Sequence, residues 1–281
     1  MKLAVVATTP DVHKPSPVAL LSGSLEEKLR KAAEFGCDGV ELMPIEPAKI
    51  DVAGLRKMLG QHGLEAAAIA SGALADGAGL TLLAADHAVA EQAQERLWLL
   101  IELAAAVGAP VVTIGGFRGR LAAVADGHGR DRLIQALQAA AAYAAPRHVR
   151  LAIEPLNRYE SDNVITCEEG LELLDEIGHA HVGLLIDLFH ANIEEPSITE
   201  SIAQVAAAGR LWHVHLGDSN RLAPGWGHID FGAVVAALRD VGYTGYLSGE
   251  LLPQPTPDAA ARQTIHFMRQ FMPPANKARS P

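Results

Sequence analysis

The sequence predicts an α/β fold in which eight parallel strands close into a single barrel with helices around it. Short apolar runs alternate eight times with longer segments of helical periodicity, which is the pattern of consecutive parallel β/α units. The length of 281 residues is close to the roughly 250 residues of a common (β/α)8 barrel. With 49% hydrophobic and 20% charged residues, the chain has enough apolar side chains for one large core.

Each expected strand is a run of β-branched or aliphatic residues, and the eight runs are Lys2–Ala7, Gly39–Met43, Ala66–Ala70, Pro110–Ile114, Arg150–Glu154, Val182–Asp187, Leu211–Leu216 and Tyr246–Glu250. The expected helices lie between them and after the last strand, at Leu25–Phe35, Val52–His62, Asp86–Val107, Asp131–Tyr143, Cys167–Glu176, Ile198–Ala208, Phe231–Val241 and Asp258–Phe271. We place the barrel at residues 1–272 and expect residues 273–281 to form a frayed tail.

Local signals support these boundaries. Ser24, followed by Glu27 three residues later, matches the capping box that begins a helix. Glycine, which adopts the left-handed conformation at low cost, follows four of the helical segments, at Gly36, Gly63, Gly108 and Gly242. An open nucleotide-binding sheet is the competing architecture, but the turn after the first strand reads TTPDVHKPSP and lacks the glycine-rich pattern of such folds.

Charge and leader patterns exclude several classes of partner. The formal net charge of −10, without a cluster of lysine and arginine, argues against a nucleic-acid partner. No apolar run approaches the roughly 18 residues of a membrane span, and Pro10 interrupts the opening segment too early for a signal peptide. We therefore expect a cytoplasmic protein with no membrane partner. Cys37 and Cys167 lack disulfide or zinc spacing, and homo-oligomerisation is left open.

Three carboxylates and a histidine occur at or near strand ends, where a barrel of this class builds its active site. Glu154, Asp187 and Glu250 end the fifth, sixth and eighth expected strands, and His215 lies in the seventh. Since three converging carboxylates would repel one another, a divalent cation is expected among them. Oxygen ligands with one nitrogen suit Mn²⁺, Mg²⁺ or Co²⁺, and we favour Mn²⁺. The alternative is that these are ordinary exposed carboxylates of the barrel rim.

Further candidates lie close to these residues in the sequence. His190, Glu160 and Arg221 occupy loop positions shortly after the strand ends, where functional side chains concentrate, so we expect them to bind substrate. His213 alternates with His215 on one strand and points to the same side. It is therefore a rival metal ligand or a supporting histidine, and we prefer His215 because it lies closer to the loop.

The segments IEPLNRYE, IDLFHANIEE and HLGDSNR resemble the metal and substrate motifs of the xylose isomerase-like barrel superfamily. Within it, the chain resembles the ketose 3-epimerases of the tagatose and psicose type over essentially the whole barrel. More narrowly, LADG at Leu74–Gly77, GFRGR at Gly116–Arg120 and SNRLAPGWGHIDF at Ser219–Phe231 resemble the 5-keto-L-gluconate epimerases of inositol catabolism.

The resemblance implies that the four strand-end residues bind the metal and that Glu154 and Glu250 also transfer protons on opposite faces of the substrate's C3. His190 and Arg221 would hold substrate oxygens, and Glu160 would be a further carboxylate near the reacting end of the sugar. Inversion of a carbon beside a ketone would then proceed through a cis-enediolate, for which no organic cofactor is needed.

The substrate class is predicted from the loop after the fourth strand. Tagatose-type epimerases tend to carry an aromatic residue there, whereas this chain has Arg118 and Arg120 around Gly119. Because arginine pairs with carboxylates through two hydrogen bonds, we expect a keto-aldonate such as 5-keto-L-gluconate in preference to a neutral ketohexose. We assign this contact to Arg118, which is nearer the strand. The alternative is that both arginines cap a helix or pair with surface acids such as Asp126 or Asp131.

Three other functions compete with epimerisation. An isomerase of the hydroxypyruvate or inosose type would use the same metal site. An apurinic-site endonuclease shares the fold but requires a basic DNA-facing surface and more metal ligands. A non-catalytic sugar-binding barrel would not need both Glu154 and Glu250. The sequence therefore predicts a metal-dependent sugar epimerase, with a sugar or sugar acid as its small-molecule partner.

Overall fold

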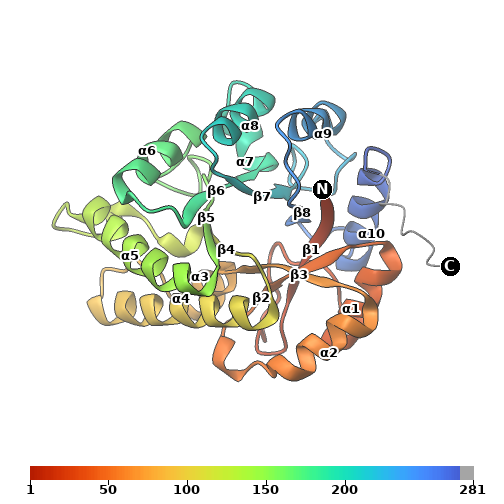
Figure 1. The fold of residues 1–281 in the computed structure, drawn as a ribbon, viewed down its shortest axis with the longest axis horizontal. Coiled ribbons are helices and arrows are strands. Elements are labelled where there is room, and N and C mark those ends of the chain that lie inside the picture. Colours follow the sequence, from red (N-terminus) through yellow and green to blue (C-terminus); the bar gives the residue numbers. More distant parts are fainter. Residues whose placement is uncertain (273–281) are drawn as a thin grey trace.

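Eight parallel strands pair in sequence order, and the ring closes because β8 also pairs with β1. The computed structural model describes residues 1–272 (Figure 1), and the expected tail at 273–281 lies outside the described residues. The strands are β1 Lys2–Thr8, β2 Gly39–Met43, β3 Glu65–Ala70, β4 Val111–Ile114, β5 Arg150–Ile153, β6 Val182–Asp187, β7 Leu211–Leu216 and β8 Tyr246–Gly249. The predicted (β/α)8 barrel is confirmed.

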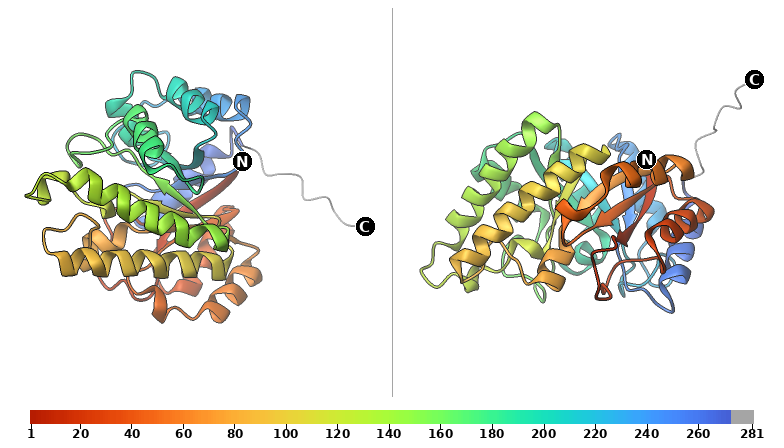
Figure 2. Two further views of the ribbon diagram at one scale, coloured as in Figure 1. Left: turned by 60° about the vertical axis from the view of Figure 1, so that its left-hand side comes forward. Right: turned by 90° about the horizontal axis from the view of Figure 1, so that it is seen from below.

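Helices surround the barrel on its outside (Figures 1 and 2). The helices are α1 Leu25–Phe35, α2 Val52–His62, α3 Gly72–Ala78, α4 His87–Val107, α5 Gly129–Ala144, α6 Cys167–Ile177, α7 Leu188–Glu194, α8 Ile198–Ala207, α9 Phe231–Asp240 and α10 Pro257–Met268. Short 3₁₀ turns also occur at η1 Pro47–Lys49, η2 Gly116–Arg118, η3 Leu121–Ala123 and η4 Ala145–Arg147.

The predicted bounds of α1, α2, β2, β6 and β7 are confirmed, and the other expected elements differ at one or both ends by one to three residues. The capping box is present, because Ser24 accepts from the Glu27 N–H while the Glu27 carboxylate accepts from the Ser24 N–H at 2.8 Å. Periodicity did not indicate α3 and α7, which follow β3 and β6 and are only seven residues long. Apolar residues resume in α7 immediately after Asp187, so only this N-cap aspartate separates the helix from β6.

The barrel interior contains polar as well as apolar side chains. Glu41 of β2, Thr113 of β4 and His213 of β7 are almost completely buried. Glu41 accepts hydrogen bonds from Thr113 at 3.2 Å and from His213 at 2.8 Å. These three strands are not neighbours in the sheet, so the contacts cross the interior of the barrel and form the floor beneath its C-terminal end.

Two sequence expectations concern features outside the barrel interior. Cys37 and Cys167 are buried and unpaired, and burial raises the pKa of the Cys37 thiol to about 12, which fits the predicted structural role. Among the described residues, no helix is both long enough and apolar enough to cross a membrane.

A pair of glycine variants tests the strand packing. A Cβ at Gly39 in β2 would lie 2.6 Å from the Glu65 carbonyl oxygen and 2.9 Å from the Tyr246 ring. Gly39→Ala should therefore lower the free energy of unfolding by about 1–3 kcal/mol through overpacking. Gly60 in α2 has no atom within 4 Å of its ideal Cβ, so Gly60→Ala should raise stability by roughly 0.5–1 kcal/mol.

Urea unfolding of the two variants and the wild type measures both effects. Equal stability of Gly39→Ala and wild type would show that β2 and β3 separate more easily than this packing requires.

Candidate metal and substrate site

The four predicted strand-end side chains come together at the C-terminal end of the barrel. Glu154 and Glu250 immediately follow β5 and β8, Asp187 ends β6, and His215 lies in β7. Each offers an atom within 4.8 Å of the others. The Nδ1 atom of His215 lies 3.0 Å from the Glu250 carboxylate, 3.6 Å from Glu154 and 3.8 Å from Asp187. All four side chains are buried.

Several polar atoms of this cluster lack a hydrogen-bond partner among the described residues. They are Oε1 of Glu154, Oδ2 of Asp187 and Nδ1 of His215, each fully shielded from solvent. A buried polar group without a partner costs about 1–3 kcal/mol, and a charged group costs more. Three carboxylates and one imidazole nitrogen fit a divalent cation of the Mn²⁺, Mg²⁺ or Co²⁺ type. The donor set therefore matches the expected metal.

Protonation equilibria reflect the crowding of charge in this cluster. Burial raises the pKa of Asp187 to about 6. Burial and the neighbouring Glu250 carboxylate also raise the pKa of Glu154 above its usual value. Burial alone would lower the pKa of His215, but the carboxylates of Glu250 and Glu41 raise it well above the usual value. Protons consequently compete with a cation for the same atoms.

Glu41 supports His215 from below, and it was not identified from the sequence. Its carboxylate lies 3.2 Å from Nε2 of His215 and 2.8 Å from Nε2 of His213. Because a carboxylate accepts the Nε2 proton, Nδ1 of His215 faces the acidic cluster, and once its own proton leaves it would offer a lone pair to a cation. His213 is bound to Glu41 instead of the cluster. The available signal was a glutamate within the otherwise apolar strand GVELM.

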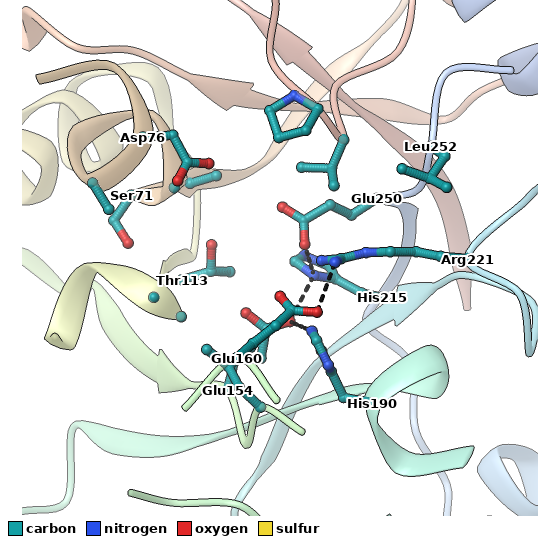
Figure 3. Close-up of a pocket in the computed structure, with 18 of the residues that line it drawn as sticks. Ser71, Asp76, Thr113, Glu154, Glu160, His190, His215, Arg221, Glu250 and Leu252 are labelled. Carbon is teal, nitrogen blue, oxygen red and sulfur yellow. Dashed lines mark hydrogen bonds and ion pairs between the residues drawn. The ribbon is translucent and has the colours of Figure 1, made fainter. Parts of the chain in front are cut away.

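A cavity of about 500 Å³ opens above the cluster and is lined by His190, Glu160 and Arg221 (Figure 3). The Asn157 backbone N–H donates to Nδ1 of His190 at 3.3 Å, so Nε2 carries the proton of the neutral ring. Burial lowers the pKa of His190, and its Nε2 has no partner among the described residues. His190 is therefore a hydrogen-bond donor available to a ligand.

Glu160 and Arg221 form an ion pair on the same side of the cavity. Arg221 donates from Nη1 to Glu160 at 2.9 Å, and the Asn157 amide donates to the same carboxylate oxygen at 3.1 Å. The guanidinium also lies over the Phe189 ring, 4.9 Å from its centroid. The structure thus brings all three predicted loop residues, His190, Glu160 and Arg221, to one pocket.

Asp218, which was also missed, organises the loop that carries Arg221. The carboxylate is fully buried and accepts four backbone N–H groups at 2.8–3.1 Å, from Ser219, Gly225, Gly227 and Ile229. Arg221 adopts a positive φ of 60°, and its N–H donates to the Asp218 carbonyl at 2.7 Å. The partners of Asp218 are backbone N–H groups, which every residue type except proline carries, so no pattern of residue types in the sequence indicated this role.

The prediction that Arg118 contacts the substrate is wrong. The side chain is completely buried. It donates from Nε to Asn163 at 2.8 Å and from Nη1 to the Glu154 and Gly115 carbonyls at 2.8 and 3.0 Å. Its Nη2 donates to three further oxygens, those of Ser161, Asn163 and Val164. Every donor is engaged, so Arg118 joins the loop after β4 to the loop after β5.

Arg120, rather than Arg118, lines the cavity. It is exposed, and its Nη2 donates to the Glu160 carbonyl at 2.9 Å. The expectation failed because Arg118 was chosen for its nearness to the strand, whereas the segment forms the 3₁₀ turn η2, in which the Arg118 side chain is buried. Neither arginine pairs with Asp126 or Asp131 among the described residues, and Asp126 bonds Arg132 instead.

Glu41→Gln tests the support beneath His215. The variant keeps the shape of the side chain but removes the negative charge that holds the Nε2 proton, and such changes typically weaken metal binding about 10- to 100-fold. Calorimetric titration of the metal-free protein with Mn²⁺ measures the dissociation constant. Glu172→Gln, an exposed position on α6, is the matched control. Unchanged affinity in Glu41→Gln would contradict the role of this contact.

Metal affinity should rise with pH. The pKa of Asp187 is raised to about 6, so its proton is retained below that pH and must leave when a cation binds. The dissociation constant for Mn²⁺ should therefore increase at least tenfold for each pH unit below about 6, since Asp187 alone contributes one displaced proton and the His215 proton must leave as well. Titrations at pH 5, 6 and 7.5, in buffers of different ionisation enthalpy, measure affinity and proton release. A dissociation constant independent of pH would refute this competition.

Comparisons with known proteins agree with this geometry. Residues 29–271 match the model of the family described as "Xylose isomerase-like TIM barrel". The chain is 31% identical over 242 residues to an L-ribulose 3-epimerase of Methylomonas sp. (strain DH-1), covering 85% of this chain and 82% of the relative. It is 36% identical over 236 residues to an L-ribulose 3-epimerase of Mesorhizobium japonicum, covering 80% and 75%.

Solved structures show the same relationship. An L-ribulose 3-epimerase structure superposes with a TM-score of 0.78 at 28% identity, covering 96% of this chain and 94% of that one. The resemblance predicted from the three motifs is confirmed for ketose 3-epimerases, while the narrower likeness to 5-keto-L-gluconate epimerases stays a prediction. The chain belongs to the xylose isomerase-like TIM barrel family and is a carbohydrate epimerase-type member of it.

Proposed function

We propose that this protein is a divalent-metal-dependent ketose 3-epimerase, with Glu154, Asp187, His215 and Glu250 as the metal ligands. The observation that carries the proposal is the position of two glutamates, Glu154 and Glu250, on non-neighbouring strands at one buried cluster. The relatives named as L-ribulose and D-psicose 3-epimerases support the same reaction class. Mn²⁺ is the proposed ion, with Mg²⁺ and Co²⁺ as alternatives.

Proton transfer is assigned to Glu154 and Glu250. One carboxylate removes the C3 proton, and the carboxyl group of the other returns a proton to the opposite face, so the carbon is inverted without net oxidation. A bound divalent cation supplies positive charge beside the substrate carbonyl and makes the adjacent C–H more acidic.

The loop residues are assigned to substrate positioning. His190 offers its Nε2 proton to a substrate oxygen, since this buried atom has no partner among the described residues. Arg221 and Glu160 form a fixed ion pair at 2.9 Å that presents donors and acceptors to the neighbouring hydroxyls. Together they hold the reacting end of the sugar between Glu154 and Glu250.

A keto-aldonate is the second candidate substrate, and Arg120 is the observation that favours it. Arg120 lines the cavity and takes the role that the sequence predicted for Arg118. A charged hydrogen bond to a substrate carboxylate contributes about 1.5–3 kcal/mol. Arg120→Ala would then lower kcat/KM for 5-keto-L-gluconate selectively. An isomerase that moves hydrogen between adjacent carbons is distinguished by identifying the product.

Glu250→Gln and Glu154→Gln test the proton-transfer pair. Each variant removes a carboxylate that exchanges protons with C3, and loss of general acid–base catalysis lowers turnover by about 10²- to 10⁴-fold. Proton NMR in D₂O measures epimerisation and deuterium uptake at C3 with L-ribulose and D-psicose. Glu172→Gln should retain wild-type turnover.

Metal content must be measured in each variant, because both glutamates also belong to the proposed metal site. Substantial epimerisation by Glu250→Gln at full metal occupancy would refute its assignment.

A further inference from the structure

The side of the cavity opposite the acidic cluster is formed by α3 and the residue before it. Figure 3 shows Ser71 and Asp76 on this side, facing the space that separates them from Glu250, His215 and Arg221. All five residues line the same cavity. The roles proposed above involve the cluster side alone, so the α3 side has no assigned partner.

Ser71 is built into this wall with an unused hydroxyl group. The residue is 1% exposed, and its Oγ has no hydrogen-bond partner among the described residues. It occupies the N-cap position of α3, where serine normally accepts a backbone N–H, but no such bond is formed. A buried hydroxyl without a partner is destabilising, and a ligand in the cavity would supply the partner.

Asp76 lies farther along α3, where it is solvent-exposed and lines the cavity (Figure 3). No hydrogen bond contributes to its environment, and Arg221, the cation whose charge acts on it across the cavity, is already bonded to Glu160. Partial burial and the charge of Glu250 raise the pKa of Asp76. The carboxylate therefore has free acceptor sites and lacks a cationic partner among the described residues.

Packing holds the backbone of α3 on both sides of Asp76. Leu74 is completely buried, and Gly77 packs so closely on Ile45 that a Cβ would lie 2.5 Å from the isoleucine Cδ1. Leu74 packs into the main hydrophobic core, and Gly77 attaches α3 to Ile45 in the segment after β2. Gly72 and Ala75, the small residues of α3 that line the cavity, leave space for a ligand beside Asp76.

We infer that Ser71 and Asp76 form a subsite for the hydroxyl groups at the end of the sugar remote from C3, and that the substrate is a neutral ketose. The inference rests on the proposed function, which places the reacting end at the acidic cluster. Sugar hydroxyls donate to the Asp76 carboxylate, and the Ser71 hydroxyl donates to or accepts from a neighbouring hydroxyl. A carboxylate at that end of the substrate would be repelled by Asp76, so a keto-aldonate is disfavoured.

The test compares substrates with and without the remote end. D-psicose carries it, L-erythrulose ends one carbon beyond C3, and 5-keto-L-gluconate carries a carboxylate there. The variants are Asp76→Ala, Asp76→Asn and Ser71→Ala, with Asp175→Asn on the exposed face of α6 as control. In each Mn²⁺-loaded protein, kcat/KM is measured by NMR and the dissociation constant of each sugar by calorimetry.

The subsite predicts that Asp76→Ala lowers kcat/KM and affinity for D-psicose about 10- to 100-fold, the effect of losing a hydrogen bond to a charged group. For L-erythrulose, kcat/KM and affinity should change less than twofold in the same variant. Ser71→Ala should also lower kcat/KM for D-psicose. Asp76→Asn should raise kcat/KM for 5-keto-L-gluconate relative to kcat/KM for D-psicose.

Three results would overturn the inference: equal losses for D-psicose and L-erythrulose, no loss for either, or a wild-type preference for 5-keto-L-gluconate. Binding separates this inference from the proposed function. If the wild type binds D-psicose in an Asp76-dependent manner but exchanges no C3 deuterium, the epimerase proposal fails and the subsite stands. If turnover is normal but independent of Asp76, the subsite fails and the epimerase proposal stands.

Discussion

The constraint on which this structure depends is the burial of three carboxylates around one imidazole nitrogen. Glu154, Asp187 and Glu250 lie within a few ångströms of Nδ1 of His215, where water cannot screen their mutual repulsion. Such an arrangement requires positive charge, supplied by a divalent cation or by protons. Glu41 directs Nδ1 toward the carboxylates by binding the opposite ring nitrogen. The chemistry of the site and its dependence on pH both follow from this arrangement.

Buried ionic groups away from the cluster hold the loops that complete the site. Arg118 joins the loops after β4 and β5 through carbonyl and side-chain oxygens, one of them the Glu154 carbonyl. Asp218 gathers backbone N–H groups of the loop after β7 and positions Arg221. In each case a charge is buried because several hydrogen bonds replace its hydration. Arg118 and Asp218 therefore act on the site indirectly, by fixing the backbone of the loops whose side chains face the cavity.

The two sides of the cavity carry different kinds of polar groups for binding the substrate. The cluster side carries the ionic pair of Arg221 and Glu160 with the His190 donor, and it suits the carbonyl end of a sugar. The α3 side carries Ser71 and Asp76, whose acceptor atoms suit hydroxyl groups. Arg120 also lines the cavity and favours an acidic substrate, but its Nη2 already bonds the Glu160 carbonyl.

By itself, the sequence determined the barrel, the order of its elements and the strand-end position of the acidic cluster, because periodicity, capping residues and apolar runs are local properties of the chain. It also identified His190, Glu160 and Arg221 by their short distance from the strand ends. Only the tertiary structure decided which arginine of the GFRGR segment faces the cavity, and which of Glu41, Ser71, Asp76 and Asp218 support or line the site. The physical reason is that these roles depend on partners from other strands and loops, and on backbone turns such as η2, which short-range patterns do not encode.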